Sequence, residues 1–165
     1  MKTGYTVADA MTQEPIFVTP KTSVSDAAKT MKEFKVGSLL IKDNEQVVGI
    51  CTERDMVFNI IAEDKKASSL SVEEIMTRNL KTISADKDIF DALMVMRDYN
   101  IRRLPVVNGS DFVGLLTLKD VLKIEPQLFD LLVDTMDIRE AESKPVRNIN
   151  PDASDEVDDI INGRK

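Results

Sequence analysis

The sequence predicts a mixed α/β (α+β) fold built from two copies of one small unit, and three observations support this prediction. Residues 7–57 align without a gap with residues 72–122, and many of the paired positions hold identical or similar residues. Each copy alternates short aliphatic runs typical of strands with stretches whose apolar residues recur at helical spacing. Only 5% of the 165 residues are aromatic and none is Trp, so we expect an aliphatic, Met-rich core.

The internal repeat sets the domain organisation, because a repeated supersecondary unit is used as a building block. We divide the chain into a first repeat at residues 4–62, a linker at 63–70, a second repeat at 71–124, a C-terminal helix at 125–137 and a tail at 138–165. Pro126 and an apolar stripe predict the C-terminal helix. The tail is acidic and poor in apolar residues, so we expect it to be flexible.

Each repeat begins with a short helix and a brief strand. The spacing of Thr6 and Asp9, and of Ser71 and Glu74, is that of a capping box, in which a hydroxyl and a carboxylate satisfy free backbone amides. It predicts a helix that runs to Met11 in the first copy and to Met76 in the second. We expect the strands at residues 16–18 and 81–83.

A longer amphipathic helix follows in each copy. Ser23 and Asp88 are the expected N-caps. Apolar residues then recur at i, i+3, i+4 and i+7 over residues 24–34 and 89–99, which places one apolar stripe on each helix. This stripe is expected to cover a sheet.

The sheet is predicted from two hairpin strands per copy, followed by a closing helix. The strands are residues 38–41 and 47–51 in the first copy, and 104–107 and 112–116 in the second, with turns at Asp43-Asn44 and Asn108-Gly109. Pro105 cannot donate a ladder hydrogen bond, so we expect it at a strand start or edge. The closing helices are expected to begin at Thr52 and Thr117.

One copy alone is too small to be stable, since about 60 residues bury too little surface to offset chain entropy. The two β-α-β-β-α repeats are therefore expected to pack face to face about a pseudo-twofold axis. This arrangement creates two related clefts at the interface between the repeats.

Composition excludes several classes of function. The chain has no His and one Cys, which removes His-based catalytic triads, most catalytic zinc sites and an internal disulfide. The formal net charge of −7 is concentrated in residues 125–165, so we expect no binding to nucleic acid duplexes. The sequence contains no secretory h-region and no membrane span, so we expect a cytoplasmic protein that does not bind a membrane.

The segments Gly49-Ile-Cys-Thr-Glu-Arg-Asp55 and Gly114-Leu-Leu-Thr-Leu-Lys-Asp120 are the sharpest local signals. Thr-x-x-Asp is a good capping box that needs no ligand. Alternatively, the Gly lets another group approach the backbone, the Asp accepts hydrogen bonds from a ribose, and the Thr and the adjoining base face a phosphate. The spacing alone does not decide between these two interpretations.

These two motifs, the ungapped repeat and the segment Ile101-Arg-Arg-Leu-Pro-Val-Val107 resemble a tandem pair of cystathionine-β-synthase (CBS) domains, also called a Bateman module. The resemblance covers residues 4–124. It implies binding of an adenosine-containing ligand, such as AMP, ADP or ATP, in the two clefts. It also implies a regulatory module with the nucleotide as its regulatory ligand. An enzyme acting on nucleotides is disfavoured, because a catalyst needs a positioned base or metal and the chain has no His and no clustered carboxylates. We therefore expect no enzyme, no cofactor and no metal.

The resemblance further implies which residues bind the ligand. The first cleft would hold the ribose at Asp55 and the phosphates at Arg102 and Arg103, and its residues are Ile50, Thr52, Arg54, Asp55, Leu80, Lys81, Ile101, Arg102 and Arg103. The second cleft would be formed by Pro15, Ile16, Val36, Gly37, Leu115, Thr117, Lys119 and Asp120. Gly37-Ser38 stands where the second repeat has Arg102-Arg103, so we expect the Asp55 cleft to bind phosphate more tightly.

Three functions remain open at this point. The first is a sensor of the adenine nucleotide pool that signals through a homodimer or through a separate protein target. The second is a sensor of S-adenosylmethionine or a dinucleotide. The third is a scaffold that binds no ligand, dimerises and recruits a partner through its acidic tail. In a dimer, Val57, Ile60 and Ile61 on the closing helix are expected to be covered by the second copy.

Overall fold

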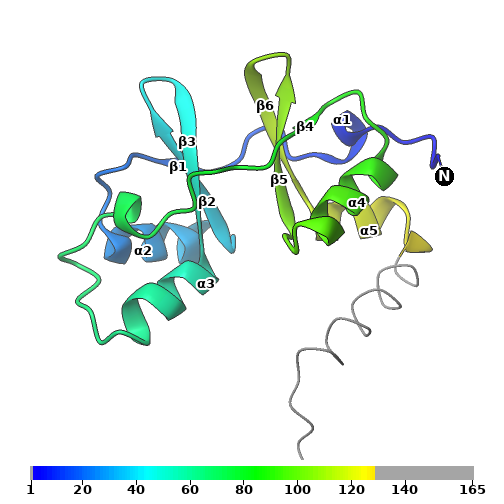
Figure 1. Ribbon diagram of the computed structural model, residues 1–165. Helices are drawn as coiled ribbons and strands as arrows, with labels where there is room; N and C mark the ends of the chain where they lie inside the picture. The colour runs from blue at the N-terminus through cyan, green and yellow to red at the C-terminus, as the bar shows by residue number, and fades with distance from the viewer. Residues whose placement is uncertain (1, 129–165) are drawn as a thin grey trace, which may run out of the picture. The chain divides into compact units, whose positions relative to one another are not determined.

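The computed structural model describes residues 2–128, which form two three-stranded sheets and the helices that pack on them (Figure 1). In the first repeat the elements are α1 (Val7–Ala10), β1 (Phe17–Val18), α2 (Val24–Phe34), β2 (Ser38–Asp43), β3 (Gln46–Thr52), α3 (Glu53–Met56) and the π-helix η1 (Val57–Ile61). The second repeat contains the 3-10 helix η2 (Val72–Glu74), β4 (Ile83–Ser84), α4 (Ile89–Asp98), β5 (Arg103–Asn108), β6 (Asp111–Thr117) and α5 (Leu118–Ile124). The predicted mixed α/β fold with two similar repeats is confirmed.

The two sheets have the same topology. Their strand orders are β1-β2-β3 and β4-β5-β6, and in each the short first strand pairs in parallel with the central strand. The central strand and the last strand form an antiparallel hairpin with an irregularity near its tip. The first hairpin turns at Asn44 and Glu45, which both have positive φ, and the second turns at Gly109 and Ser110. Both turns therefore lie one residue later than the sequence predicted.

Pro105 lies inside the central strand β5, so the predicted placement at a strand start or edge is wrong. The equivalent position in the first repeat explains why the sheet tolerates it. There, the N–H of Leu40 donates to the carbonyl of Ile16 over 3.1 Å. Pro105 has no N–H, so the corresponding carbonyl, that of Lys81, does not receive this bond. Lys81 precedes the two-residue strand β4, so the lost bond falls outside the paired residues of the ladder.

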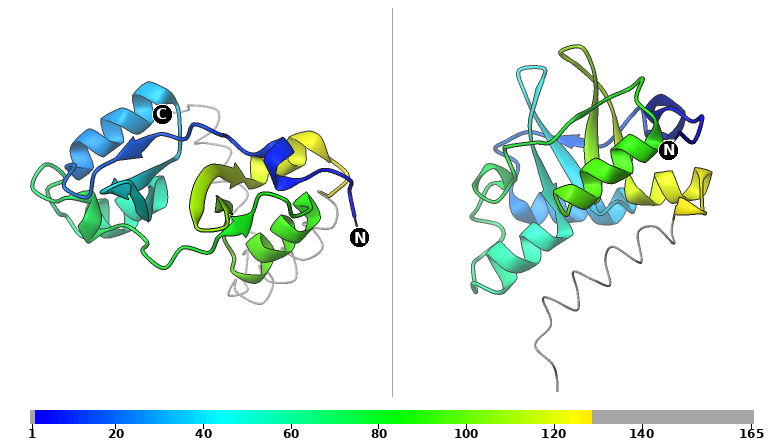
Figure 2. Two further views of the ribbon diagram at one scale, coloured as in Figure 1. Left: turned by 90° about the horizontal axis from the view of Figure 1, so that it is seen from above. Right: turned by 45° about the vertical axis from the view of Figure 1, so that its right-hand side comes forward.

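The opening segment of each repeat packs against the other repeat. The α1 helix contacts α4 and α5 of the second repeat, as Figures 1 and 2 show. The N–H of Val7 donates to the carbonyl of Lys87 over 2.8 Å. In the same way, the N–H of Val72 donates to the carbonyl of Thr22 over 2.9 Å. The two repeats are thus joined by exchange of their first segments.

This exchange also determines the cores. One cluster consists of buried side chains of the first repeat together with Val72 and Met76 from the second repeat. A second cluster, formed by Leu40, Ile50 and Leu115, contains residues from both sheets. Each sheet therefore buries its apolar side chains partly through the other repeat, which agrees with the expectation that one copy is too small to be stable alone.

The ends of the two repeats differ. In the first, the closing helix changes from α3 to the π-helix η1, in which Ile60 is buried while Val57 and Ile61 are exposed. The expectation that Ile60 is covered by a second copy is therefore wrong, because Ile60 belongs to the core. In the second, α5 ends at Ile124 and the chain turns at Pro126 and Gln127.

The predicted helix over residues 125–137 lies largely outside the described residues, and the predicted tail at 138–165 lies wholly outside them. Within residues 2–128, no helix has the length and apolarity needed to cross a membrane.

Candidate functional site

Both Thr-x-x-Asp motifs form capping boxes at the starts of α3 and α5. The Oδ2 atom of Asp55 accepts hydrogen bonds from the backbone N of Thr52 over 2.8 Å and from Thr52 Oγ1 over 2.7 Å. The corresponding distances from Thr117 to Asp120 Oδ2 are 3.1 and 2.6 Å. The capping interpretation is therefore confirmed for both motifs. Because the boxes use Oδ2, the Oδ1 atom of each carboxylate can accept a ligand hydroxyl without breaking the cap.

Gly49 and Gly114 are sites of close approach, but the approaching group belongs to the opposite repeat. A Cβ added to Gly49 would lie 2.5 Å from the Sδ of Met76, and one added to Gly114 would lie 2.6 Å from the Sδ of Met11. The requirement for Gly is explained by the crossing of the exchanged segments. A ligand is therefore not needed to explain why Gly occupies positions 49 and 114.

The crossing segments also form hydrogen bonds with the backbone N–H and C=O groups of two predicted site residues, Ile50 and Leu115. The N–H groups of Ile50 and Leu115 donate to the carbonyls of Thr77 and Thr12 over 3.0 and 2.9 Å. Their carbonyls accept from the N–H groups of the same two threonines, each over 2.9 Å. The N–H groups of Ile50 and Leu115 are therefore not free to bind a ligand.

Arg103 reaches from the second repeat to the first. Its Nη2 atom donates to the carbonyl of Gly37 over 3.2 Å. A Cβ on Gly37 would lie 3.0 Å from this Nη2 and 2.8 Å from Oε2 of Glu53, so the guanidinium and the carboxylate flank the same point. Burial lowers the pKa of the Arg103 guanidinium below its ordinary value, the nearby charge of Arg102 lowers it further, and the carboxylates of Glu53 and Asp55 oppose this shift.

Two other basic side chains predicted for the first cleft lie against aromatic rings. The Nζ of Lys81 is 4.3 Å from the ring centroid of Tyr99, and the Cζ of Arg54 is 4.8 Å from that of Phe58. Both bases are exposed, as is Arg102. Arg103 thus donates a hydrogen bond to the opposite repeat and is influenced by two of its carboxylates, those of Glu53 and Asp55.

Glu53 was not among the predicted site residues. It is the first residue of α3, and its backbone N–H donates to the carbonyl of Gly37 over 3.3 Å. The equivalent N–H, that of Leu118, donates to the carbonyl of Arg102 over 2.9 Å. Comparison of the two motifs could have identified Glu53, because the aligned position holds an apolar residue.

The second predicted cleft carries less charge. Asp120 is near Lys123, with 3.9 Å between Oδ1 and Nζ, and Lys119 is exposed. Ile16 and Val36 pack against the first core cluster, and the carbonyl of Ile16 is taken by Leu40. The remaining predicted residues of the two clefts, Pro15 and Ile101, are half-buried.

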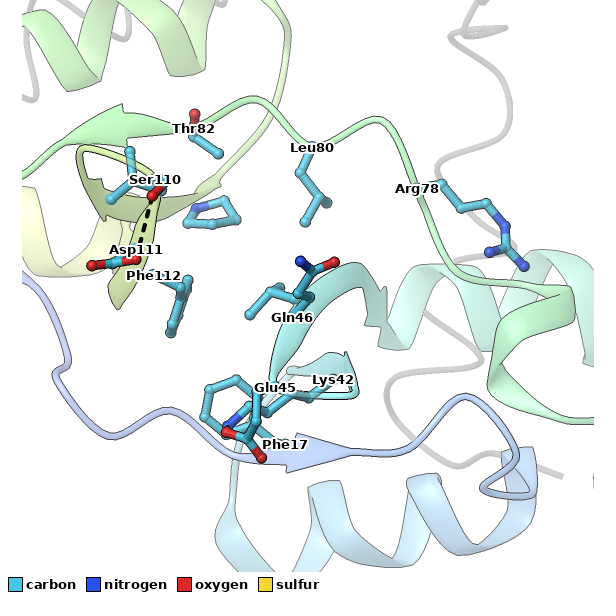
Figure 3. A pocket seen from close by; sticks show the side chains of 13 residues that line it. Phe17, Lys42, Glu45, Gln46, Arg78, Leu80, Thr82, Ser110, Asp111 and Phe112 are labelled. Atoms are coloured by element: carbon cyan, nitrogen blue, oxygen red, sulfur yellow. Dashed lines mark hydrogen bonds and ion pairs between the residues drawn. The ribbon is translucent and has the colours of Figure 1, made fainter.

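A cavity of about 710 Å³ lies between the two hairpins (Figure 3). Figure 3 shows Gln46, Leu80 and Phe112 facing one another across it. Leu80 is the only predicted site residue in its lining. The lining contains Lys42 and Arg78 but also Glu45 and Asp111, so opposite charges balance and do not indicate an anion site.

Other chemistry has little support in the described residues. Burial raises the pKa of the Cys51 thiol to about 12, which leaves almost no thiolate at neutral pH. Within residues 2–128, no group of three or more acidic or Cys side chains is placed to hold a metal ion.

Comparison with known proteins gives consistent matches along the described residues. The family described as "CBS domain" matches residues 7–62 and 72–126. The CBS domain-containing protein YhcV of Bacillus subtilis is 30% identical over 115 residues, which are 70% of this chain and 81% of YhcV.

Two solved structures illustrate the structural similarity. The crystal structure of an uncharacterized conserved protein from Pyrococcus horikoshii has a TM-score of 0.70 and 32% identity, covering 75% of this chain and 94% of that one. The CBS domain pair of protein MJ0100, solved in complex with 5′-methylthioadenosine and S-adenosyl-L-methionine, has a TM-score of 0.65 and 32% identity, covering 73% of this chain and 94% of that one.

Proposed function

The chain belongs to the CBS-domain family as a tandem pair, and we propose that it is a regulatory module that binds an adenosine-containing ligand in the Asp55 cleft. Pairs of CBS domains are generally regulatory and bind ligands, and they are generally not catalytic. The candidate ligands include the adenine nucleotides AMP, ADP and ATP. The proposed role is non-catalytic, with the effect exerted on this protein's own assembly or on a separate target.

The observation that carries this proposal is the meeting of Asp55 and Arg103 across the two repeats. The two charges are close enough for the carboxylate to influence the guanidinium, although Asp55 lies in α3 of the first repeat and Arg103 in β5 of the second. Asp55 keeps its Oδ1 atom available for a ribose hydroxyl, because its capping bonds use Oδ2. A ligand bound to both residues would span the two repeats and so favour one arrangement of them over another.

We further propose that the module works as a homodimer. Large apolar side chains are exposed on α2 and η1 and at the C-cap of α4: Phe34 is 52% exposed, Phe58 54%, Ile61 69% and the C-cap residue Tyr99 54%. Apolar groups gathered on a few helices are typical of a surface that a partner covers. A second copy of the chain would cover this surface and couple two sets of clefts.

Binding can be tested by thermal melting and calorimetry with AMP, ADP, ATP, S-adenosylmethionine and 5′-methylthioadenosine. A ligand that binds only the folded state raises the melting temperature, by several degrees at a concentration of about 100 Kd. We expect Asp55→Ala to lose most of this shift.

Asp9→Ala is the matched control for this test. Asp9 forms the same capping box with Thr6, with distances of 2.8 and 2.7 Å to Oδ2, but is not a predicted ligand residue. Both variants keep the N-cap Thr and lose the two hydrogen bonds that the N3 carboxylate accepts from it, so we expect similar losses of stability. The proposal fails if none of the five ligands stabilises the wild-type protein, or if Asp55→Ala responds to the ligand as Asp9→Ala does.

The alternative ligand is S-adenosylmethionine or a related adenosyl compound. The specific observation in its favour is Glu53, whose carboxylate stands beside Arg103 where a phosphate would bind. The scaffold interpretation predicts that no small molecule stabilises the protein. The same melting series therefore distinguishes all three functions.

A further inference from the structure

Glu53 and Arg103 occupy a gap that exists because residue 37 has no side chain. The position of a Cβ on Gly37 lies within 3.0 Å of both Arg103 Nη2 and Glu53 Oε2. Arg103 is further fixed by its hydrogen bond to the carbonyl of Gly37. The side chain that we propose to bind an anion in this cleft therefore has a negative charge beside it.

The position of Glu53 has a direct consequence for a ligand. A phosphate that pairs with Arg103 enters the neighbourhood of the Glu53 carboxylate and of Asp55. Like charges at such separations repel, and the repulsion grows with the charge of the arriving group. A 5′ substituent that is neutral or carries a positive charge does not suffer this repulsion.

The second cleft lacks this arrangement. Leu118 stands where the first repeat has Glu53, and Gly37 and Ser38 stand where the second repeat has Arg102 and Arg103. The second cleft therefore has no counterpart of Glu53 and none of Arg102 and Arg103. The pair of opposite charges is a property of the Asp55 cleft.

We propose that Glu53 is a specificity-determining residue of the Asp55 cleft, which disfavours adenosyl ligands in proportion to the negative charge of their 5′ substituent. The cleft accordingly selects ligands whose 5′ group is neutral or positively charged, such as a thioether or a sulfonium, over phosphorylated ones. This inference rests on the proposed function, since it concerns the same cleft. It also replaces the expectation that two arginines make this cleft the tighter phosphate site.

The test is isothermal titration of adenosine, AMP, ADP and S-adenosylmethionine into the wild-type protein and Glu53→Gln. We expect the Kd of adenosine to change less than twofold, and that of AMP to fall by roughly 3- to 10-fold. We expect the affinity for ADP to increase by at least the same factor as that for AMP, and the affinity for S-adenosylmethionine to decrease in the variant. Because Glu53 is exposed, the gain for AMP shrinks in 0.5 M salt.

Three further variants make the test specific. Glu53→Leu installs the residue found at the aligned position Leu118, so it should fold and reproduce the gain for AMP. Glu63→Gln removes the same charge from an exposed residue of the linker and should leave every Kd unchanged. In the Arg103→Met background, Glu53→Gln should give no gain for AMP, because without the guanidinium the phosphate is not held beside residue 53.

The possible outcomes separate this inference from the proposed function. If adenosine binds both proteins and the ratio of AMP to adenosine affinity is the same in each, the inference is overturned and the proposed function stands. If no adenosyl compound binds either protein, both are overturned. A gain for AMP that persists in the Arg103→Met background also overturns the inference.

Discussion

Leu115 and Thr12 exchange two backbone hydrogen bonds of 2.9 Å, although they belong to different repeats. Ile50 and Thr77 form the equivalent pair, with distances of 3.0 and 2.9 Å. Each pair fastens the opening segment of one repeat to the last strand of the other. The Gly that precedes Ile50 or Leu115 allows this contact, because it leaves room for the Met and Thr that cross the strand.

We predict that Gly114→Ala destabilises the protein more than Gly49→Ala. A Cβ at residue 114 would lie 2.8 Å from the backbone carbonyl oxygen of Thr12, whereas one at residue 49 would lie 3.1 Å from that of Thr77. Each added Cβ would also meet the sulfur of a Met side chain, which can move aside. A backbone carbonyl can move only at a larger cost in free energy. We expect losses in the free energy of unfolding of about 2 kcal/mol for Gly114→Ala and about 1 kcal/mol for Gly49→Ala.

Urea unfolding followed by circular dichroism measures these losses. Gly109→Ala provides a comparison of another kind, since nothing lies within 4 Å of its added Cβ and only the positive φ of 62° opposes the substitution. Equal stability of Gly114→Ala and the wild-type protein would show that the exchanged segment is not tightly packed against the strand.

Asp88 should make the attachment of the N-terminal segment depend on pH. Its carboxylate accepts hydrogen bonds from the backbone N of Thr3 over 2.9 Å, from Thr3 Oγ1 over 2.8 Å and from the backbone N of Phe90 over 2.8 Å. Burial acts to raise the pKa of Asp88, but hydrogen bonds from Phe90, Thr3 and Gly4 outweigh it and lower the pKa below its ordinary value.

The sign of the effect follows from this lowered pKa. The ionised carboxylate is favoured by folding, so its contribution to stability is complete above the unfolded pKa of about 4 and is lost as the pH falls through the lower folded value. We expect Asp88→Asn to lower the melting temperature at pH 7, and the difference from the wild-type protein to shrink below about pH 4. Asp111→Asn, exposed in a hairpin, serves as the control. A difference that stays constant down to pH 2.5 would contradict the assignment.

The homodimer can be tested at Ile61, which is 69% exposed. A charge placed within a covered apolar surface disfavours association, so we expect Ile61→Glu to raise the dissociation constant at least tenfold. Analytical ultracentrifugation would show a dimer for the wild-type protein and the 18.5 kDa monomer for the variant. Tyr5→Glu changes an apolar residue that is 45% exposed on the N-terminal segment, and it should leave the dimer intact. A wild-type protein that stays monomeric at high concentration refutes the dimer.

Local patterns predicted most elements of the fold. The capping residues Thr6, Ser23 and Asp88 and the apolar stripes of α2 and α4 depend on neighbours within a few positions of the chain, so they can be identified from sequence. The strand position of Pro105 could not be predicted in this way. It depends on where the short strand β4 begins, which is a property of the assembled sheet.

The candidate site was predicted less completely. The repeated motif identified Thr52, Asp55 and their counterparts, because its residues are close in sequence and recur in both copies. It did not identify Glu53, whose significance depends on Arg103 and on the missing side chain of Gly37. Those three residues come from different parts of the chain, and their charges matter only at the separation that packing gives them.

By itself, the sequence determined that this protein consists of two like units with mixed α/β structure, because an ungapped repeat and its capping and apolar patterns are local properties. The tertiary structure decided that the units exchange their opening segments, so that Gly49 and Gly114 accommodate the protein's own chain. It also decided that a glutamate accompanies Arg103 in the cleft. Contacts between distant segments depend on how apolar surface is buried and backbone groups are paired, and these requirements are met only when the two units assemble.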